Sequence, residues 1–163
     1  MKRLLIVYHS RTGGTEQMVR AAAEGAAAAT RVETAVRKAP EADPDAVLAA
    51  DGYLFACPEN LASMAGLMKE FFDRCYYPAL ERLNGRPYAT MICAGSDGSI
   101  AAAQIARIAT GWRLREISAP LIVCTHAQTP DEILKPKRIG AEDLARCREL
   151  GTTIAAGLEM GIF

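Results

Sequence analysis

Short apolar runs alternate with longer segments of helical period along the whole chain. None of these runs alternates regularly with polar residues, as is typical of strands that are buried on both faces. Runs of this kind, separated by helical segments, predict a parallel sheet whose strands are joined by helical crossovers on both faces. The predicted strands are Leu4 to Tyr8, Val32 to Val36, Tyr53 to Cys57, Tyr88 to Cys93 and Leu121 to Cys124.

Helical segments are predicted between and after these strands. The clearest runs from Met64 to Cys75, where apolar residues recur every three or four positions, and Ser63 is its expected N-cap. The others are expected at Gly14 to about Ala29, near Asp45 to Ala50, after Asp97 as far as Trp112, and at Ala141 to Met160. Together they predict one α/β domain over residues 1–163, a three-layer doubly wound sheet with 2-1-3-4-5 as the leading strand order. Ligands bind such sheets at the carboxyl ends of the strands, so the loops after strands one, three and four are the candidate site.

Composition narrows the possible functions. The chain has 163 residues, half of them hydrophobic, which is enough for one sizeable core. Its 19 basic and 19 acidic residues cancel, so neither nucleic acid nor an anionic membrane is expected as a partner. The first apolar run is shorter than a signal-peptide core, and no later run reaches membrane-span length, so we expect a cytoplasmic protein. Five scattered cysteines form no Cys-x-x-Cys pair, and we expect reduced packing residues and no metal site.

The loop from Ser10 to Glu16 lies directly between a predicted strand and a predicted helix. Two glycines allow a tight turn that points successive N–H groups inward, three hydroxyls add donors, and the helix N-terminus adds partial positive charge. This combination predicts a site for a phosphate monoester, although an ordinary capped turn is the alternative. The loop has neither the Gly-x-Gly-x-x-Gly spacing of a dinucleotide fingerprint nor the Gly-Lys-Ser/Thr of a P-loop.

The same loop resembles the FMN-phosphate loop of flavodoxins, whose pattern Ser/Thr-x-Thr-Gly-x-Thr-Glu is matched from Ser10 to Glu16. The second loop and its helix, Cys57 to Arg74, resemble NAD(P)H-dependent FMN reductases and multimeric flavodoxin-like quinone reductases. In those families a strand ends at Pro, a short loop borders the flavin ring, and a Ser-Met-Ser/Ala-Gly turn opens a helix that ends Phe-x-Asp-Arg. The resemblance implies a flavodoxin-like fold with FMN as cofactor, and Pro58 to Met64 along the ribityl chain and ring.

The third loop, Ala94 to Ser99, also starts a helix. Its N–H groups can meet the pyrimidine edge of a flavin, where negative charge develops on reduction, and a simple Asp or Ser cap explains the loop equally well. The predicted FMN-binding residues are therefore Ser10, Arg11, Thr12, Gly13, Gly14 and Thr15 at the phosphate; Pro58, Glu59, Asn60, Leu61, Ser63 and Met64 at the ribityl chain and ring; and Gly95, Ser96, Asp97 and Gly98 at the pyrimidine edge.

Three features depart from the family patterns or stand outside them. Glu59 and Asn60 occupy positions where flavodoxins and many reductases place an aromatic residue. Tyr76-Tyr77-Pro78 follows the third helix and is interpreted as packing, with contact to a partner subunit's flavin site as the alternative. The segment from Thr125 to Gly140 is unusually long and basic, and it is interpreted as a solvated connection or as a cover that contacts a nicotinamide cofactor's phosphate.

The resemblance implies an oxidoreductase that passes electrons from NADPH or NADH, through FMN, to a quinone, a flavin or another small acceptor, and that forms a homodimer or higher homo-oligomer. The flavin performs the chemistry, so no side chain is expected to be catalytic. The alternatives are an electron-carrier flavodoxin, which zero net charge and a non-aromatic second loop disfavour, and a module with weak or lost flavin binding. A phosphorylatable receiver domain is excluded, because His9-Ser10 and Cys57-Pro58 occupy the places of its acidic residues.

Overall fold

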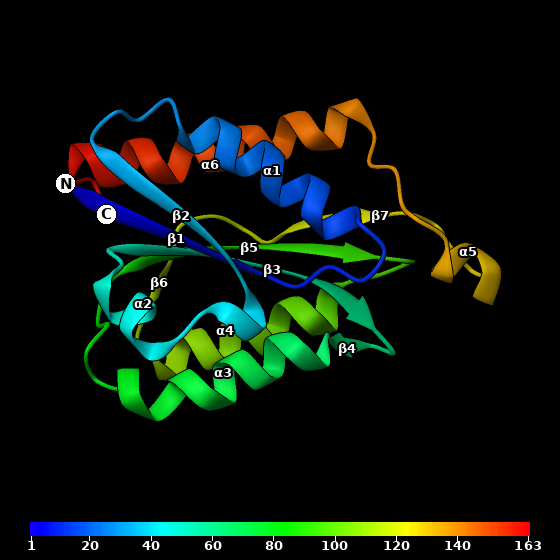
Figure 1. Cartoon of the computed structure of the whole chain (residues 1–163), viewed down its shortest axis with the longest axis horizontal. Coiled ribbons are helices and arrows are strands. Elements are labelled where there is room, and N and C mark those ends of the chain that lie inside the picture. Colours follow the sequence, from blue (N-terminus) through cyan, green and yellow to red (C-terminus); the bar gives the residue numbers. More distant parts are fainter.

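Seven strands form the central sheet in the computed structural model, which describes residues 1–163. The five main strands lie side by side in the order β2, β1, β3, β5 and β7, all parallel, so the predicted order is confirmed. Figure 1 shows their carboxyl ends meeting at one edge, opposite the two chain termini. The main strands are β1 (Lys2–Tyr8), β2 (Val32–Lys38), β3 (Gly52–Asn60), β5 (Pro87–Ala94) and β7 (Leu121–Cys124).

Helices cover both faces of the sheet, as the apolar strands require (Figure 1). One face carries α1 (Gly14–Ala26) and α6 (Ala141–Met160), and the other carries α2 (Pro44–Ala49), α3 (Gly66–Ala79) and α4 (Ser99–Gly111). A short helix, α5 (Pro130–Leu134), projects beyond the carboxyl ends of the strands. None of the helices combines the length and the hydrophobicity that a membrane span requires.

The two helical layers are packed by different means. Between the sheet and α3 and α4, an aromatic cluster surrounds Phe55, whose ring centroid lies 5.2 Å from that of Phe72 and 6.4 Å from that of Trp112. On the opposite face, α1 and α6 approach each other through Gly25 and Gly151, where an added Cβ would overlap backbone atoms of the facing helix. Glycine therefore sets the distance between these two helices.

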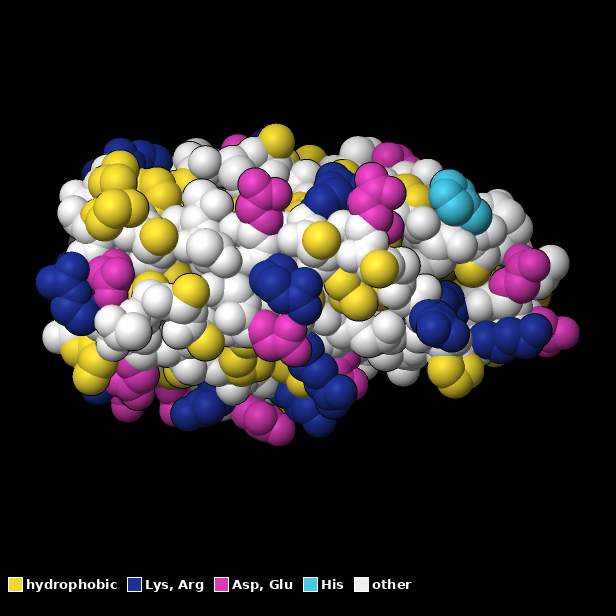
Figure 2. All heavy atoms as spheres, turned by 90° about the horizontal axis from the view of Figure 1, so that it is seen from above, with side chains coloured by type: hydrophobic (Ala, Val, Ile, Leu, Met, Phe, Trp, Pro, Cys, Tyr) yellow, Lys and Arg dark blue, Asp and Glu magenta, His cyan; other side chains and the backbone are white.

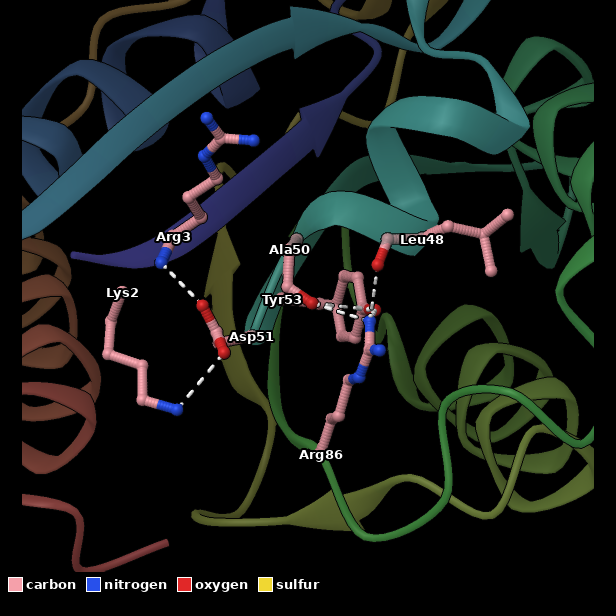
Figure 3. A network of polar contacts seen from close by, with 7 residues as sticks. All are labelled: Lys2, Arg3, Leu48, Ala50, Asp51, Tyr53 and Arg86. Atoms are coloured by element: carbon pink, nitrogen blue, oxygen red, sulfur yellow. Dashed lines mark hydrogen bonds and ion pairs between the residues drawn. The ribbon is translucent and has the colours of Figure 1, made fainter.

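Polar contacts hold the amino edge of the sheet, where β1 and β3 begin (Figure 3). Asp51 accepts hydrogen bonds from the Arg3 N–H at 2.8 Å and from the Lys2 ammonium at 3.1 Å. Burial alone would raise the pKa of Asp51, but these two donors hold that pKa below its usual value. Arg86 donates to the Leu48 and Ala50 carbonyls and to the Tyr53 hydroxyl, which ties α2 to the starts of β3 and β5.

Several predicted boundaries are wrong. The helix α1 ends at Ala26 rather than Ala29, and α3 begins at Gly66 after Ala65. Ser63 is not the cap of α3, because it lies in the two-residue strand β4 (Ser63–Met64), which pairs antiparallel with β3. Three short elements were not predicted: the 3₁₀ turn η1 (Ala39–Glu41), β6 (Arg115–Glu116) and α5.

Candidate functional site

A cavity of about 440 Å³ opens at the carboxyl edge of the sheet, where the three predicted loops converge. The pairing of β1 with β3, of β3 with β5 and of β5 with β7 brings these strand ends together, and a fourth segment from α5 closes one side. The lining residues are Arg11, Thr12, Pro58, Glu59, Asn60, Leu61, Ala62, Cys93, Ala94, Gly95, Ser96, Thr125, Ala127, Gln128, Ile133 and Lys137.

The first loop ends at a helix start that is left without a cap. Gly13 has φ +90° and ψ −8°, a conformation that favours glycine, and no side chain caps the first turn of α1. Within the protein, the N–H groups of residues 11, 12, 14, 15 and 16 donate to no acceptor. The Ser10 hydroxyl accepts the Gly13 N–H at 3.2 Å and thereby shapes the turn.

Thr15 adds a buried hydroxyl to this set of donors. Its side chain is 1% exposed, and its Oγ1 has no hydrogen-bond partner in the protein. A buried polar atom without a partner costs free energy, so such atoms are rare unless a ligand or water satisfies them. Unpaired N–H groups, an unpaired hydroxyl and the positive end of α1 are the features that bind a phosphate dianion, and the residues present fit the phosphate of FMN.

The second loop is a tight hairpin. Glu59 pairs with Met64 and Asn60 with Ser63, so Leu61 and Ala62 form a two-residue turn. Both turn residues have positive φ, 50° and 55°, and the Leu61 side chain is fully exposed at the tip. Because non-glycine residues adopt this conformation at a cost, the hairpin places an apolar tip at the rim of the cavity through a strained backbone.

The third loop differs from the first, although both end in the same way. Gly98 precedes α4 with φ +89° and ψ −10°. Here the Glu59 carboxylate accepts the Gly98 N–H and the Ala101 N–H, each at 2.9 Å. The Gly98 N–H, which was a candidate for the pyrimidine edge of a flavin, is therefore already paired with a side chain from the second loop.

The segment that follows β7 is fixed against the first loop. The Lys137 N–H donates to the Thr12 carbonyl at 2.8 Å, and the Gln17 amide donates to the Gly13 and Lys137 carbonyls at 2.9 and 2.7 Å. The Gln17 Oε1 in turn accepts the Ile139 N–H at 3.1 Å. These contacts place Gln128, Ile133 and Lys137 at the cavity, so the predicted long loop forms one of its walls.

The predicted site residues are divided between the cavity and its surroundings. Arg11, Thr12, Pro58 to Leu61, Gly95 and Ser96 line it. Ser10, Gly13, Gly14 and Thr15 form the turn beneath Thr12, and the Asp97 carboxylate accepts from the N–H and the hydroxyl of Ser99. Ser63 and Met64 do not reach the cavity, because the Ser63 hydroxyl and the Met64 N–H both donate to Gln104 of α4.

Other lining residues were not predicted, and for two of them, Gln128 and Ile133, the sequence holds a recognisable signal. Thr129 and Glu132 form a capping box at the start of α5, a Ser/Thr-x-x-Glu pattern that can be found in sequence. Its recognition would have placed a helix, and hence Gln128 and Ile133, inside the long loop. Cys93 and Ala94 carry no such signal, since they end an ordinary buried strand.

The titratable groups beside the cavity do not suggest acid–base or nucleophilic catalysis. Burial raises the pKa of Cys93 to about 11, so its thiol stays protonated near neutral pH and is a poor nucleophile. Burial, and then the charge of Arg11, lower the pKa of His9, which favours the neutral imidazole. All five cysteines are free, and four of them are buried, as expected for packing residues.

Comparison with known families agrees with this geometry. The family described as NADPH-dependent FMN reductase matches residues 39–128, from η1 through the second and third loops to Gln128 in the cavity wall. The chain belongs to the NADPH-dependent FMN reductase family. The expected family and its FMN cofactor are thereby confirmed.

Curated relatives of this FMN reductase family chain match only in part. An NAD(P)H dehydrogenase (quinone) of Acidithiobacillus ferrooxidans is 35% identical, over 45% of this chain and 47% of the relative. A flavodoxin of Aquifex aeolicus is 37% identical, over 45% of this chain and 40% of the relative. The match therefore spans less than half the length of either relative.

Solved structures confirm the flavodoxin-like fold of the chain. A flavodoxin from the domain Archaea has a TM-score of 0.74 at 21% identity, covering 96% of this chain and 99% of that one. The flavodoxin, WrbA-like protein from Agrobacterium tumefaciens has a TM-score of 0.76 at 18% identity, covering 98% and 99%. At these identities, the likeness concerns the fold.

Proposed function

We propose that this chain binds FMN in the cavity at the carboxyl edge, oxidises NAD(P)H, and passes the electrons to a quinone, a free flavin or another small acceptor. The observation that carries the proposal is the uncapped start of α1, with its unpaired N–H groups and the buried, unpaired Thr15 hydroxyl. The family match and the quinone-reductase relative support the reaction type.

The residues of the chain would position the cofactor. The first loop would hold the phosphate, and Pro58 to Leu61 would border the ribityl chain and ring. Gly95 and Ser96 would lie at the pyrimidine edge, where the Glu59 carboxylate keeps the loop in place by bonding to the start of α4. When bound, FMN supplies two-electron redox chemistry, which requires no acid or base from the protein.

The experiment is a pair of titrations with the double variant Thr12→Val, Thr15→Val. FMN should bind the variant more weakly by about 1 to 3 kcal/mol for each buried phosphate contact that is lost. Riboflavin, which lacks the phosphate, should bind native protein and variant equally, so it serves as the control. Equal FMN affinity of the two proteins would refute the phosphate assignment.

The reaction itself is tested by steady-state oxidation of NADPH and NADH by the FMN-loaded protein with a quinone acceptor. The flavodoxin relative from Aquifex aeolicus makes an electron carrier the second candidate. A carrier would show no turnover with the quinone and would accumulate a long-lived one-electron-reduced flavin. Turnover with a small acceptor distinguishes the enzyme from the carrier.

A further inference from the structure

A second cavity of about 390 Å³ adjoins the first and shares three lining residues with it, Thr125, Ala127 and Lys137. It lies on the other side of the Thr125–Ala127 strip, between α5 and the start of α6. Its remaining polar lining includes His126, Glu132, Lys135, Arg138 and Asp143. A ligand in the first cavity could therefore extend over this strip into the second.

Two of the three cationic side chains that line this second cavity are free, and both of its carboxylates accept hydrogen bonds or pair with another residue. Lys135 and Arg138 are exposed and make no ion pair and no side-chain hydrogen bond. The Glu132 carboxylate accepts the Gln128 and Thr129 N–H groups, and Asp143 pairs with Arg146 at 2.9 Å. The cavity is lined by three cations and two carboxylates, and Asp143 is paired outside this set, so positive charge is in excess and neither Lys135 nor Arg138 has an acidic partner.

This arrangement contrasts with the face formed by α1 and α6. Over the face formed by α1 and α6, Figure 2 shows basic and acidic side chains interspersed. Several of the cations on that side of the molecule have partners, as Arg148 has in Glu24 and Arg20 in Glu16. Two adjacent unpaired cations beside a cavity are thus a local feature that can attract an anion.

The segment that carries these cations is held in a defined position. The Lys137 ammonium donates to the Glu132, Ile133 and Lys135 carbonyls at 2.7 to 2.8 Å. These bonds connect the end of α5 to the segment that follows it. The Lys137 N–H and the Gln17 amide then attach the segment to the first loop. Because the backbone of this segment is already ordered, a ligand would bind here without the entropy cost of ordering it.

We propose that Lys135 and Arg138 bind the 2′-phosphate of NADPH, so that this cavity selects NADPH over NADH. The inference rests on the proposed function, because it places the nicotinamide in the first cavity and the adenosine phosphate in the second. Arg and Lys are the side chains suited to a phosphate dianion, and NADH has a neutral hydroxyl at the same position.

The direct test uses FMN-loaded protein and calorimetric titration with adenosine 2′,5′-bisphosphate, AMP and inorganic phosphate. Native protein should bind the bisphosphate more tightly than AMP by a factor of about 10 to 100, the range for charge-assisted hydrogen bonds. In the double variant Lys135→Gln, Arg138→Gln this preference should disappear, while affinity for AMP stays the same. The matched control, Arg82→Gln with Arg113→Gln, removes two exposed and unpaired cations from elsewhere and should behave as native protein.

The kinetic test is the ratio of kcat/KM for NADPH to that for NADH, which should fall about 10- to 100-fold in the Lys135, Arg138 variant and not in the control. Equal binding of the bisphosphate and AMP by native protein would overturn the proposal, as would an unchanged preference in the variant. Inorganic phosphate binding as tightly as the bisphosphate would also overturn it, by revealing a general anion site. Failure to oxidise either nucleotide would instead refute the proposed function, and the titrations would still test the cavity.

Discussion

The starts of α1 and α4 have the same backbone and opposite polar environments. Each follows a glycine in the left-handed region, Gly13 at φ +90° and Gly98 at φ +89°. At neither start does a side chain at the N-cap position cap the helix. At α4, Glu59 reaches across from the second loop and accepts two N–H groups. At α1, no carboxylate plays this part: the Gly13 N–H donates only to the Ser10 hydroxyl of its own loop, the Glu16 N–H has no acceptor, and the Thr15 hydroxyl is also unpaired.

The difference indicates which helix start is reserved for a ligand. A helix N-terminus carries partial positive charge and unpaired donors, and a carboxylate or a bound anion can satisfy both. At α4 the protein supplies that anion itself, and the result is a rigid wall for the cavity. At α1 the protein supplies no such anion, so a bound phosphate would accept from the unpaired donors. The anion affinity of the cavity is therefore concentrated at the first loop.

The largest expected effect is a loss of stability that is greater for substitution of Gly98 than for substitution of Gly13. Substitution by alanine places a residue in the left-handed region at both positions, which costs about 1 to 2 kcal/mol. At Gly98 an added Cβ would also lie 2.7 Å from Ile122 Cγ2, whereas at Gly13 the nearest atom is 3.7 Å away. Crowding adds about 1 to 3 kcal/mol at Gly98 alone. In urea unfolding of the apo variants, the free energy of unfolding should therefore be clearly lower for Gly98→Ala than for Gly13→Ala. Equal losses of stability in the two variants would contradict the packing argument.

The next effect comes from giving α1 an anion of its own. Ser10→Asp keeps an acceptor for the Gly13 N–H but adds a negative charge beside the phosphate position, so FMN affinity should fall by about 100-fold or more, near 3 kcal/mol. Ser10→Asn changes the size similarly without the charge and is the matched control. Riboflavin affinity should be equal in the two variants, and a similar loss for FMN and riboflavin would show that the charge acts elsewhere.

Removing the anion from α4 should have a smaller effect, on stability. Glu59→Ala leaves the Gly98 and Ala101 N–H groups without their acceptor and should lower the free energy of unfolding by about 1 to 3 kcal/mol. Glu59→Gln keeps one acceptor oxygen without the charge and should lose less. An apo Glu59→Ala variant as stable as the native protein would show that water replaces the carboxylate fully.

The contrast between the two helix starts could be only half predicted from sequence. The apolar runs predict the parallel sheet and the loops that converge at its carboxyl edge, and the loop from Ser10 to Glu16 carries its own pattern. Periodicity does not fix the strand order, and the predicted order rests on the usual one for doubly wound domains of this size. The capping by Glu59 joins residues 39 and 42 positions apart, and no local signal marks it. Gln104 likewise holds Ser63 and Met64 in β4 from a distant helix, which is why Ser63 was wrongly expected to cap α3.

The smallest expected effect is a gain in the stability of the apo protein, whereas most substitutions of buried residues destabilise. Thr15→Val replaces a buried hydroxyl that has no partner by a methyl group of similar size, so the apo protein should gain up to about 1 kcal/mol of stability, because an unmet desolvation cost is removed. In saturating FMN the order should reverse, since the native hydroxyl would then gain the phosphate as its partner. Thermal unfolding of both proteins, with and without FMN, measures the two differences in one experiment. Destabilisation of the apo variant would mean that the hydroxyl already has a partner, such as a fixed water, and that the first loop is satisfied before any ligand binds.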